Sequence, residues 1–202
     1  MYTLYTAPSP HGHRVSIMLE EMGTPYRIRV LDLAAGDQIR PDFLVVSPLG
    51  KIPALTEEDG GRQYHLFGSA AILQYLAERH GRLMPQSRAE RAQALNWLSL
   101  ATTDLGPNGV SIHHFSVRHP LPEAFERFRL ENQRCHRALD LRLNHSPYLA
   151  GEEYSIADIA TFPFIAVVRA TYPEVLAPYG DLRRWLDLIA ARPAVQRGLA
   201  IP

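Results

Sequence analysis

Apolar positions in the first 80 residues follow two periods, one typical of strands and one typical of helices. Helical spacing starts at His11, ends near Gly23, and returns after Ser69. Short strand-like runs, bounded by proline, glycine or polar residues, occupy residues 2–5, 26–30, 52–56 and 63–66. The predicted order is β-α-β, a polar connection over residues 33–47, and then β-β-α with a turn over residues 57–61.

Strand-like patterns end near Pro85, and helical spacing dominates the rest of the chain. Four helices are predicted over residues 88–104, 122–143, 155–170 and 181–191, with an interruption at residues 105–109. This change marks the best domain boundary. The sequence therefore predicts an α/β domain over residues 1–82 and an all-helical domain over residues 88–202.

Composition and charge argue against several classes of protein. The 202 residues suit one large domain or two small ones, and 21 basic against 21 acidic residues do not suggest nucleic acid or an anionic membrane as partner. The first residues do not resemble a signal peptide, and no apolar run approaches the roughly 20 residues that span a bilayer. Cys135 is the only cysteine, which excludes an intrachain disulfide and a CxxC redox pair. A cytoplasmic protein is expected.

The segment Lys51-Ile52-Pro53 is the first candidate site. A proline that opens a strand after a Gly-Lys loop is a candidate for a cis peptide bond. In a thioredoxin-like domain, such a bond leaves the backbone of Ile52 free to pair with a peptide-like ligand. An ordinary trans proline at the start of a strand explains Pro53 equally well.

Two serines stand at predicted helix starts. Ser69 follows Phe67-Gly68 at a position where serine often caps a helix, and where free N–H groups can also bind a carboxylate. Taken alone, Ser69 is best interpreted as a cap. Ser155 and Asp158 form a capping-box-like start, with aspartate in place of the usual glutamate, and we interpret this pair as structural.

Residues 8–14 join the first strand to the first helix and contain Ser9, His11 and His13. Hydroxyl and imidazole groups beside a helix N-terminus can hold a bound thiol as its thiolate, by hydrogen bonding and through the helix dipole. A rigid turn with a helix cap explains the same residues equally well. No third ligand follows the two histidines at a recognisable spacing, so no zinc or other metal site is expected.

Together, these segments resemble the glutathione transferase superfamily over essentially the whole chain, in the family's order and spacing. The resemblance implies a thioredoxin-like βαβ-ββα domain followed by an all-helical domain. It is closer to the bacterial Nu class and the related disulfide-bond oxidoreductases. Their segments APTPNGHK, QFRPEF and LGP…HHF are similar to residues 7–14, 38–43 and 105–115, and the match extends through residues 126–134 and 144–149.

The resemblance implies a glutathione site at named positions. Ser9 takes the place of the branch's threonine near the glutathione sulfur, and His11 replaces an asparagine that donates toward it. Ile52, before a cis Pro53, pairs with the cysteinyl backbone, and Ser69 holds the γ-glutamyl carboxylate. The other implied contacts are Gln38 at the glycyl end, Lys51, Gly68, and Arg134 from the neighbouring subunit of a homodimer.

Two of these positions depart from the family pattern. Gly68 stands where the family usually has Glu or Gln, so one polar contact to the γ-glutamyl group is missing. A charge-assisted hydrogen bond is worth roughly 1.5–3 kcal/mol, enough to weaken binding tenfold or more. His11 can donate when protonated or act as a base when neutral. Either departure is compatible with an altered reaction, or with a protein that keeps the fold and has lost the catalytic activity.

The favoured hypothesis is an enzyme with glutathione as cosubstrate, held as a thiolate by Ser9, His11 and the first helix. The thiolate attacks a disulfide or a small electrophile. Because Cys135 lies far downstream in the helical domain, a reductase must use bound glutathione as its nucleophile. The likeness to the oxidoreductase branch favours disulfide reduction over conjugation.

Two alternatives stay open. A non-catalytic protein of the same fold, binding a partner or another thiol ligand, would explain Gly68. A glutathione-dependent isomerase of a small maleyl-type acid would share the fold and the ligand. The pocket for the second substrate is expected in the helical domain, around residues 106–115 and 162–172.

Overall fold

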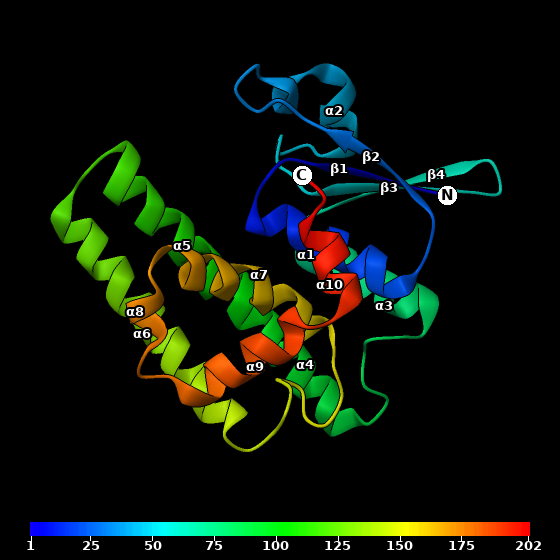
Figure 1. The fold of residues 1–202 in the computed structure, drawn as a ribbon. Coiled ribbons are helices and arrows are strands. Elements are labelled where there is room, and N and C mark those ends of the chain that lie inside the picture. Colours follow the sequence, from blue (N-terminus) through cyan, green and yellow to red (C-terminus); the bar gives the residue numbers. More distant parts are fainter. The chain divides into compact units, whose positions relative to one another are not determined.

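The computed structural model describes all 202 residues, and the chain divides into two compact units (Figure 1). Met1–Arg82 and Ala191–Pro202 form the first unit, and Leu83–Ala190 form the second. The first unit contains a sheet with helices and the second contains helices only, as the sequence pattern predicts. None of the helices combines the length and apolar composition that crossing a membrane requires.

A four-stranded sheet in the order β2-β1-β3-β4 is the centre of the first unit. β1 pairs in parallel with β2 and antiparallel with β3, and β3 pairs antiparallel with β4. The predicted thioredoxin-like βαβ-ββα order is therefore confirmed. Its elements are β1 (Tyr2–Thr6), α1 (Pro10–Met22), β2 (Tyr26–Val30), α2 (Pro41–Val46), β3 (Ala54–Asp59), β4 (Arg62–Phe67) and α3 (Ser69–His80).

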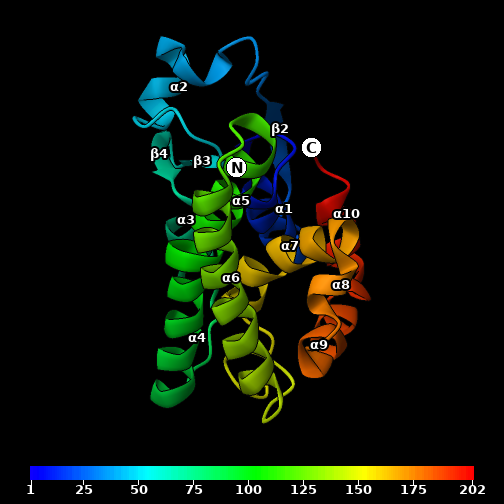
Figure 2. The same ribbon diagram turned by 90° about the vertical axis from the view of Figure 1, so that its left-hand side faces the viewer.

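Helices cover both faces of this sheet. Figures 1 and 2 show α2 on one side of the sheet and α1 and α3 on the other. Successive side chains of a strand point to opposite faces, so β1 contributes to both layers. Leu4 is fully buried on the side of α1 and α3, and Tyr5 packs on Phe43 of α2 with ring centroids 5.7 Å apart.

The hairpin of β3 and β4 differs from its prediction at both ends. β3 begins at Ala54, after the Ile52–Pro53 bond, and not at Ile52. The predicted turn over residues 57–61 shrinks to Gly60-Gly61, with φ of 54° and 77°. Because glycine adopts positive φ without steric penalty, this pair makes a two-residue hairpin turn and lets the strands extend to Asp59 and Arg62.

Residues 191–202 pack with the first unit, whereas the predicted boundary groups them with the helical domain. Helix α10 (Pro193–Leu199) lies against α1, and a Cβ on Gly198 would be only 2.6 Å from the Cα of Ile17. The Oγ of Ser16 donates to the carbonyl of Gly198 at 2.7 Å. Two ion pairs add to this contact, Arg192 with Glu21 and Arg197 with Glu20.

The second unit packs its helices around α7. All residues from Ile156 to Ile165 are buried, and Trp185 meets Phe162 edge-on with ring centroids 6.2 Å apart. Its elements are α4 (Arg88–Leu100), a π-helical turn (Ala101–Leu105), α5 (Gly106–His113), a second π-helical turn (His114–Arg118), α6 (Pro122–Leu143), α7 (Ile156–Thr171), α8 (Pro173–Leu176) and α9 (Gly180–Ala190).

The predicted interruption at residues 105–109 is wrong. The chain stays helical from α4 through the first π-helical turn into α5. Pro107 is the second residue of α5 and follows the π-helical turn, and the backbone is helical on both sides of it. Glycine and proline lower helix propensity locally, but the surrounding helical packing overrides this preference.

Candidate functional site

Three segments that are distant in sequence meet at one edge of the sheet. Tyr5 of β1 pairs with Ala54 of β3, and Ala54 pairs with Phe67 of β4. At this edge the chain leaves β1 toward α1, enters β3 after Pro53, and leaves β4 toward α3. Two helix N-termini and the turn before β3 are therefore placed at the same edge, within the first unit.

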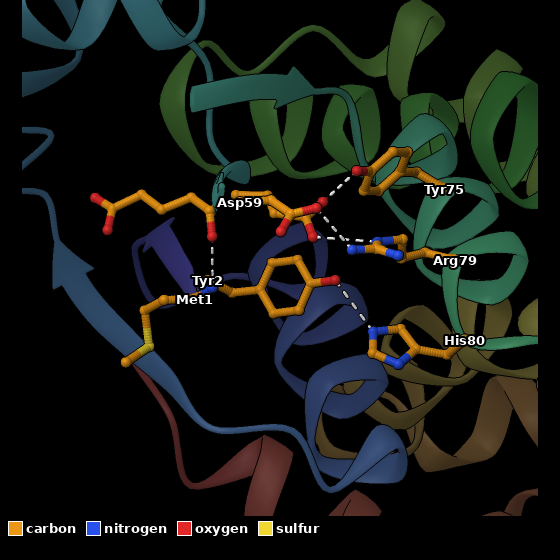
Figure 3. A network of polar contacts seen from close by, with 8 residues as sticks. Met1, Tyr2, Asp59, Tyr75, Arg79 and His80 are labelled. Atoms are coloured by element: carbon orange, nitrogen blue, oxygen red, sulfur yellow. Dashed lines mark hydrogen bonds and ion pairs between the residues drawn. The ribbon is translucent and has the colours of Figure 1, made fainter. Parts of the chain in front are cut away.

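The opposite edge of the sheet is closed by a network of paired polar groups (Figure 3). Tyr2 of β1 pairs in register with Glu57 of β3, and Glu57 is buried. The carboxylate of Glu57 accepts from the Tyr75 hydroxyl and from Nε of Arg79, while the Tyr2 hydroxyl lies 3.1 Å from Nε2 of His80. These contacts tie α3 to the sheet and satisfy the polar groups there, so this edge offers no comparable site for a ligand.

Ser9 is the N-cap residue of α1. Its Oγ accepts a hydrogen bond from the N–H of Gly12 at 3.0 Å and donates one to the carbonyl of Ala7 at 3.1 Å. The capping interpretation of this serine is therefore confirmed. To donate toward a ligand, the Ser9 hydroxyl has to turn away from Ala7.

His11 lies partly buried in the first turn of α1. Burial, followed by the positive charges of Arg14 and Lys51, lowers its pKa to about 4. The imidazole is therefore neutral at neutral pH, where it keeps one N–H donor. Two cationic side chains close to this helix N-terminus create a local potential that favours an anion such as a thiolate.

The Ile52–Pro53 bond is cis, which confirms the prediction for this turn. The backbone of Ile52 makes no hydrogen bond within the chain. The neighbouring residue is held more tightly, because the Ser47 hydroxyl donates to the Lys51 carbonyl at 2.8 Å and accepts from its N–H at 3.3 Å. The turn is thus anchored at Lys51, and the peptide groups of Ile52 remain available to a ligand.

The start of α3 is uncapped. Gly68 and not Ser69 is the N-cap residue, so the interpretation of Ser69 as a cap is wrong. No side chain bonds to the free N–H groups of this turn, and no acidic residue lies in it. Gly68 has φ of 79°, and a Cβ added there would meet no atom within 4 Å. This helix N-terminus therefore offers several donors and no acceptor side chain.

Arg14 joins α1 to the start of α3. Its Nη1 donates to the Oγ of Ser69 at 3.1 Å, and both side chains are buried. Burial lowers the pKa of Arg14 to about 9, so the guanidinium remains charged at neutral pH. Arg14 is not among the site residues predicted from the sequence. Its only signal there is a basic residue one turn into a helix, close to apolar Val15 and Met18.

Gln38 and Arg134 have other surroundings. Gln38 lies in a 3-10 turn (Asp37–Ile39), where its Nε2 donates to the carbonyl of Leu33 at 3.2 Å and its Oε1 is buried without a partner. Arg134 lies on α6 of the helical unit, where its side chain is exposed and forms an ion pair with Glu131 at 3.3 Å. Their contacts with a ligand remain predictions.

A shallow apolar depression of about 210 Å³, largely open to solvent, lies on the helical unit between the second π-helical turn and the start of α6. Of the two ranges predicted for a second-substrate pocket, it shares only Phe115. No group of His, Cys, Asp and Glu side chains in the structure could hold a metal ion. The depression is lined by Phe115, Ser116, Pro120, Leu121, Pro122 and Phe125.

Comparison with known proteins agrees with this architecture. Family models for the N-terminal and C-terminal domains of glutathione S-transferase match residues 8–79 and 114–193. The disulfide-bond oxidoreductase YfcG of Escherichia coli strain K12 is 42% identical over 204 residues, covering 98% of this chain and 94% of that protein. The chain belongs to the glutathione S-transferase family.

Solved structures of glutathione transferases extend the similarity over the whole chain. A family member from Pseudomonas fluorescens with two glutathione bound superposes with a TM-score of 0.93 at 38% identity, covering 100% of this chain and 93% of that one. A glutathione transferase from Pseudomonas putida with one glutathione disulfide bound per subunit has a TM-score of 0.90 at 36% identity, with coverage of 100% and 91%. Both units of this chain therefore have counterparts in the family.

Proposed function

We propose that this protein binds glutathione as a thiolate at the sheet edge where α1, Ile52 and α3 meet, and uses it to reduce a disulfide. The convergence of these three elements carries the proposal: a helix start with cationic neighbours, free peptide groups and an uncapped helix start. In glutathione, the thiol suits the start of α1, the cysteinyl backbone suits the peptide groups of Ile52, and the γ-glutamyl carboxylate suits the start of α3. The glutathione bound in similar structures and the name of the oxidoreductase relative support the same ligand.

The thiolate is stabilised at the start of α1. The neutral His11 donates its ring N–H to the sulfur, and the Ser9 hydroxyl adds a second hydrogen bond when it turns from Ala7. The charges of Arg14 and Lys51, together with the helix dipole, favour the thiolate over the thiol.

The rest of the tripeptide binds along the same edge. The peptide groups of Ile52 pair with the cysteinyl residue, in the manner of an added strand. Ser69 and the N–H groups that follow Gly68 hold the γ-glutamyl carboxylate. Gln38 and Lys51 bind the glycyl end.

The reaction is a pair of thiol–disulfide exchanges. The bound thiolate attacks one sulfur of the substrate disulfide, so a mixed disulfide forms and the other sulfur leaves as a thiolate. A second glutathione thiolate then attacks the mixed disulfide, giving glutathione disulfide and the second substrate thiol. The protein contributes no sulfur, because Cys135 is buried and burial is the main cause that raises its pKa to about 11.

Calorimetric titration with reduced and oxidised glutathione tests the binding step. Dissociation constants from micromolar to low millimolar are expected, and assays with a small disulfide then follow on Ser9→Ala and His11→Ala. Loss of turnover in these variants supports the assigned roles, whereas full turnover in both contradicts them. If the folded protein binds neither form, the non-catalytic scaffold becomes the better interpretation.

We further propose a cytoplasmic homodimer in which Arg134 reaches the ligand of the neighbouring subunit. The support is the exposure of this side chain, 78%, together with the family resemblance. Sedimentation should show a dimer. Arg134→Ala should weaken glutathione binding without dissociating the dimer. A monomer that binds glutathione with full affinity contradicts this arrangement.

A further inference from the structure

A buried cation lies directly behind the start of α3. Arg14 is 1% exposed, and its Nη1 donates to the Oγ of Ser69, which is itself 7% exposed. A guanidinium buried to this extent loses most of its hydration, which is unfavourable unless its position serves packing or function. The site residues assigned through family resemblance do not include it.

The hydrogen bond from Arg14 orients the Ser69 hydroxyl. An oxygen that accepts from a guanidinium presents a lone pair to it and turns its own proton elsewhere. No acceptor within the chain takes that proton. The proton can therefore join the free N–H groups of the first turn of α3 in binding an anion.

The same turn contains no negative charge. Its first turn has no acidic residue, and its N-cap residue, Gly68, has no side chain. A hydroxyl, several N–H groups and a guanidinium behind them suit a carboxylate. Nothing in this turn suits an ammonium group, which requires an acceptor.

We propose that Arg14 is the positioning residue for the carboxylate bound at the start of α3, and that this turn recognises the carboxylate without selecting for an ammonium group beside it. This inference rests on the proposed function, in which the carboxylate is that of the γ-glutamyl residue. Arg14 acts through the orientation of Ser69 and through its charge.

Three thiol peptides test the proposal by calorimetry on the full chain. Glutathione is compared with 4-aminobutyryl-Cys-Gly, which lacks the γ-glutamyl α-carboxylate, and with glutaryl-Cys-Gly, which lacks the amino group. Loss of the carboxylate should weaken binding about ten- to hundredfold. Loss of the amino group should change the dissociation constant by less than about threefold.

The variants Arg14→Met and Arg14→Lys test whether the preference for the γ-glutamyl carboxylate depends on the buried charge. All three peptides share the thiol, so loss of the Arg14 charge beside the thiolate weakens binding of all of them alike. Beyond this common loss, the Met variant should weaken glutathione binding about tenfold more than 4-aminobutyryl-Cys-Gly binding, with partial recovery in the Lys variant. A purely structural role for Arg14, or a role confined to the thiolate, would instead weaken binding of all three peptides equally. If Arg14→Met fails to fold, Ser69→Ala should show the same loss, confined to the two peptides that carry the carboxylate.

The outcomes separate this inference from the proposed function. Equal affinity of the unaltered protein for glutathione and 4-aminobutyryl-Cys-Gly overturns the role of Arg14 and leaves glutathione binding intact. A strong preference for glutathione over glutaryl-Cys-Gly would show that the site does select for the ammonium group, which overturns that part of the proposal. Failure of the folded protein to bind any of the peptides overturns both proposals.

Discussion

The structure uses the serines at the starts of α7 and α3 in opposite ways. At α7, Ser155 is the N-cap residue, and Asp158 completes a capping box, as the sequence predicts. The buried carboxylate of Asp158 also accepts from the N–H of Leu149 at 3.0 Å and from Nε1 of Trp185 at 2.9 Å. This helix start is closed, because its own side chains occupy the donors around it.

The start of α3 is open by comparison. Gly68 supplies no cap, and Ser69 accepts from Arg14 instead of bonding to the N–H groups of its helix. The same residue type thus stabilises the fold at α7 and is available to a ligand at α3. The difference lies in what the fold places beside each serine: a carboxylate that closes the turn, or a guanidinium that leaves the turn open for an anion.

Removing the carboxylate that closes α7 should have the largest effect. Asp158→Ala leaves two backbone N–H groups and the Trp185 indole without an acceptor in the core, so we expect a loss of about 3–5 kcal/mol in the free energy of unfolding. Urea denaturation measures it. Asp42→Ala, at an exposed aspartate in the first turn of α2, is the control and should change little. Equal losses in the two variants would refute the role assigned to Asp158.

The helical unit, which contains α7, should also make the free energy of unfolding sensitive to acid. His136 is buried without a hydrogen bond to either ring nitrogen, and burial lowers its pKa from 6.5 to about 4. Between these values the unfolded chain binds a proton that the folded chain does not. The neutral His136 side chain therefore contributes fully to the free energy of unfolding above pH 6.5. This contribution falls as the pH drops toward 4, by up to about 3 kcal/mol.

Unfolding in urea as a function of pH checks this sensitivity. His136→Leu should reduce the pH dependence below pH 6.5. A comparable part should remain from His11, whose pKa is also lowered to about 4, with a further part from His13, whose pKa burial also lowers. An unchanged slope in His136→Leu would show that His136 is not the source.

Alanine at the two serines separates the roles directly. Ser155→Ala removes a cap and should lower the free energy of unfolding by about 1–2 kcal/mol, with glutathione binding retained. Ser69→Ala should weaken glutathione binding about tenfold. It also removes the acceptor for Nη1 of the buried Arg14, so a loss of about 1–3 kcal/mol in the free energy of unfolding is expected as well. Melting curves and calorimetry on both variants provide the crossed comparison. The contrast fails if Ser155→Ala also weakens glutathione binding, or if Ser69→Ala leaves it unchanged.

The smallest effect is expected at Gly68. Its φ of 79° disfavours any other residue, so Gly68→Glu and the matched control Gly68→Ala should each lower stability by about 1 kcal/mol. Only the glutamate supplies an acceptor for the ligand's ammonium, and its Cβ has open space. Glutathione affinity should therefore rise by up to about tenfold in Gly68→Glu alone. A similar rise in Gly68→Ala would exclude a charge effect.

Much of the first unit could be predicted from sequence because its signals are local. Alternation and turn residues locate the strands, and the spacing after His11 and after Ser69 locates two helices. Local signals fail where the low helix propensity of a residue has to be weighed against packing. Pro107 is an example, because it lies in a continuous helical stretch that the sequence pattern predicts to be interrupted. They also place Ser69 at a helix start without deciding whether Ser69 or Gly68 is the cap.

By itself, the sequence determined the α/β and helical character of the two units, the capping box of α7 and the Ile52–Pro53 turn. Each depends on residues that lie within a few positions of one another. Only the tertiary structure decided that Arg14 lies behind Ser69, 55 residues away, and that Gly198 packs on α1 and bonds to Ser16 across 182 residues. Such contacts depend on which segments the folded core brings together, and side-chain burial and charge at those contacts are set only there.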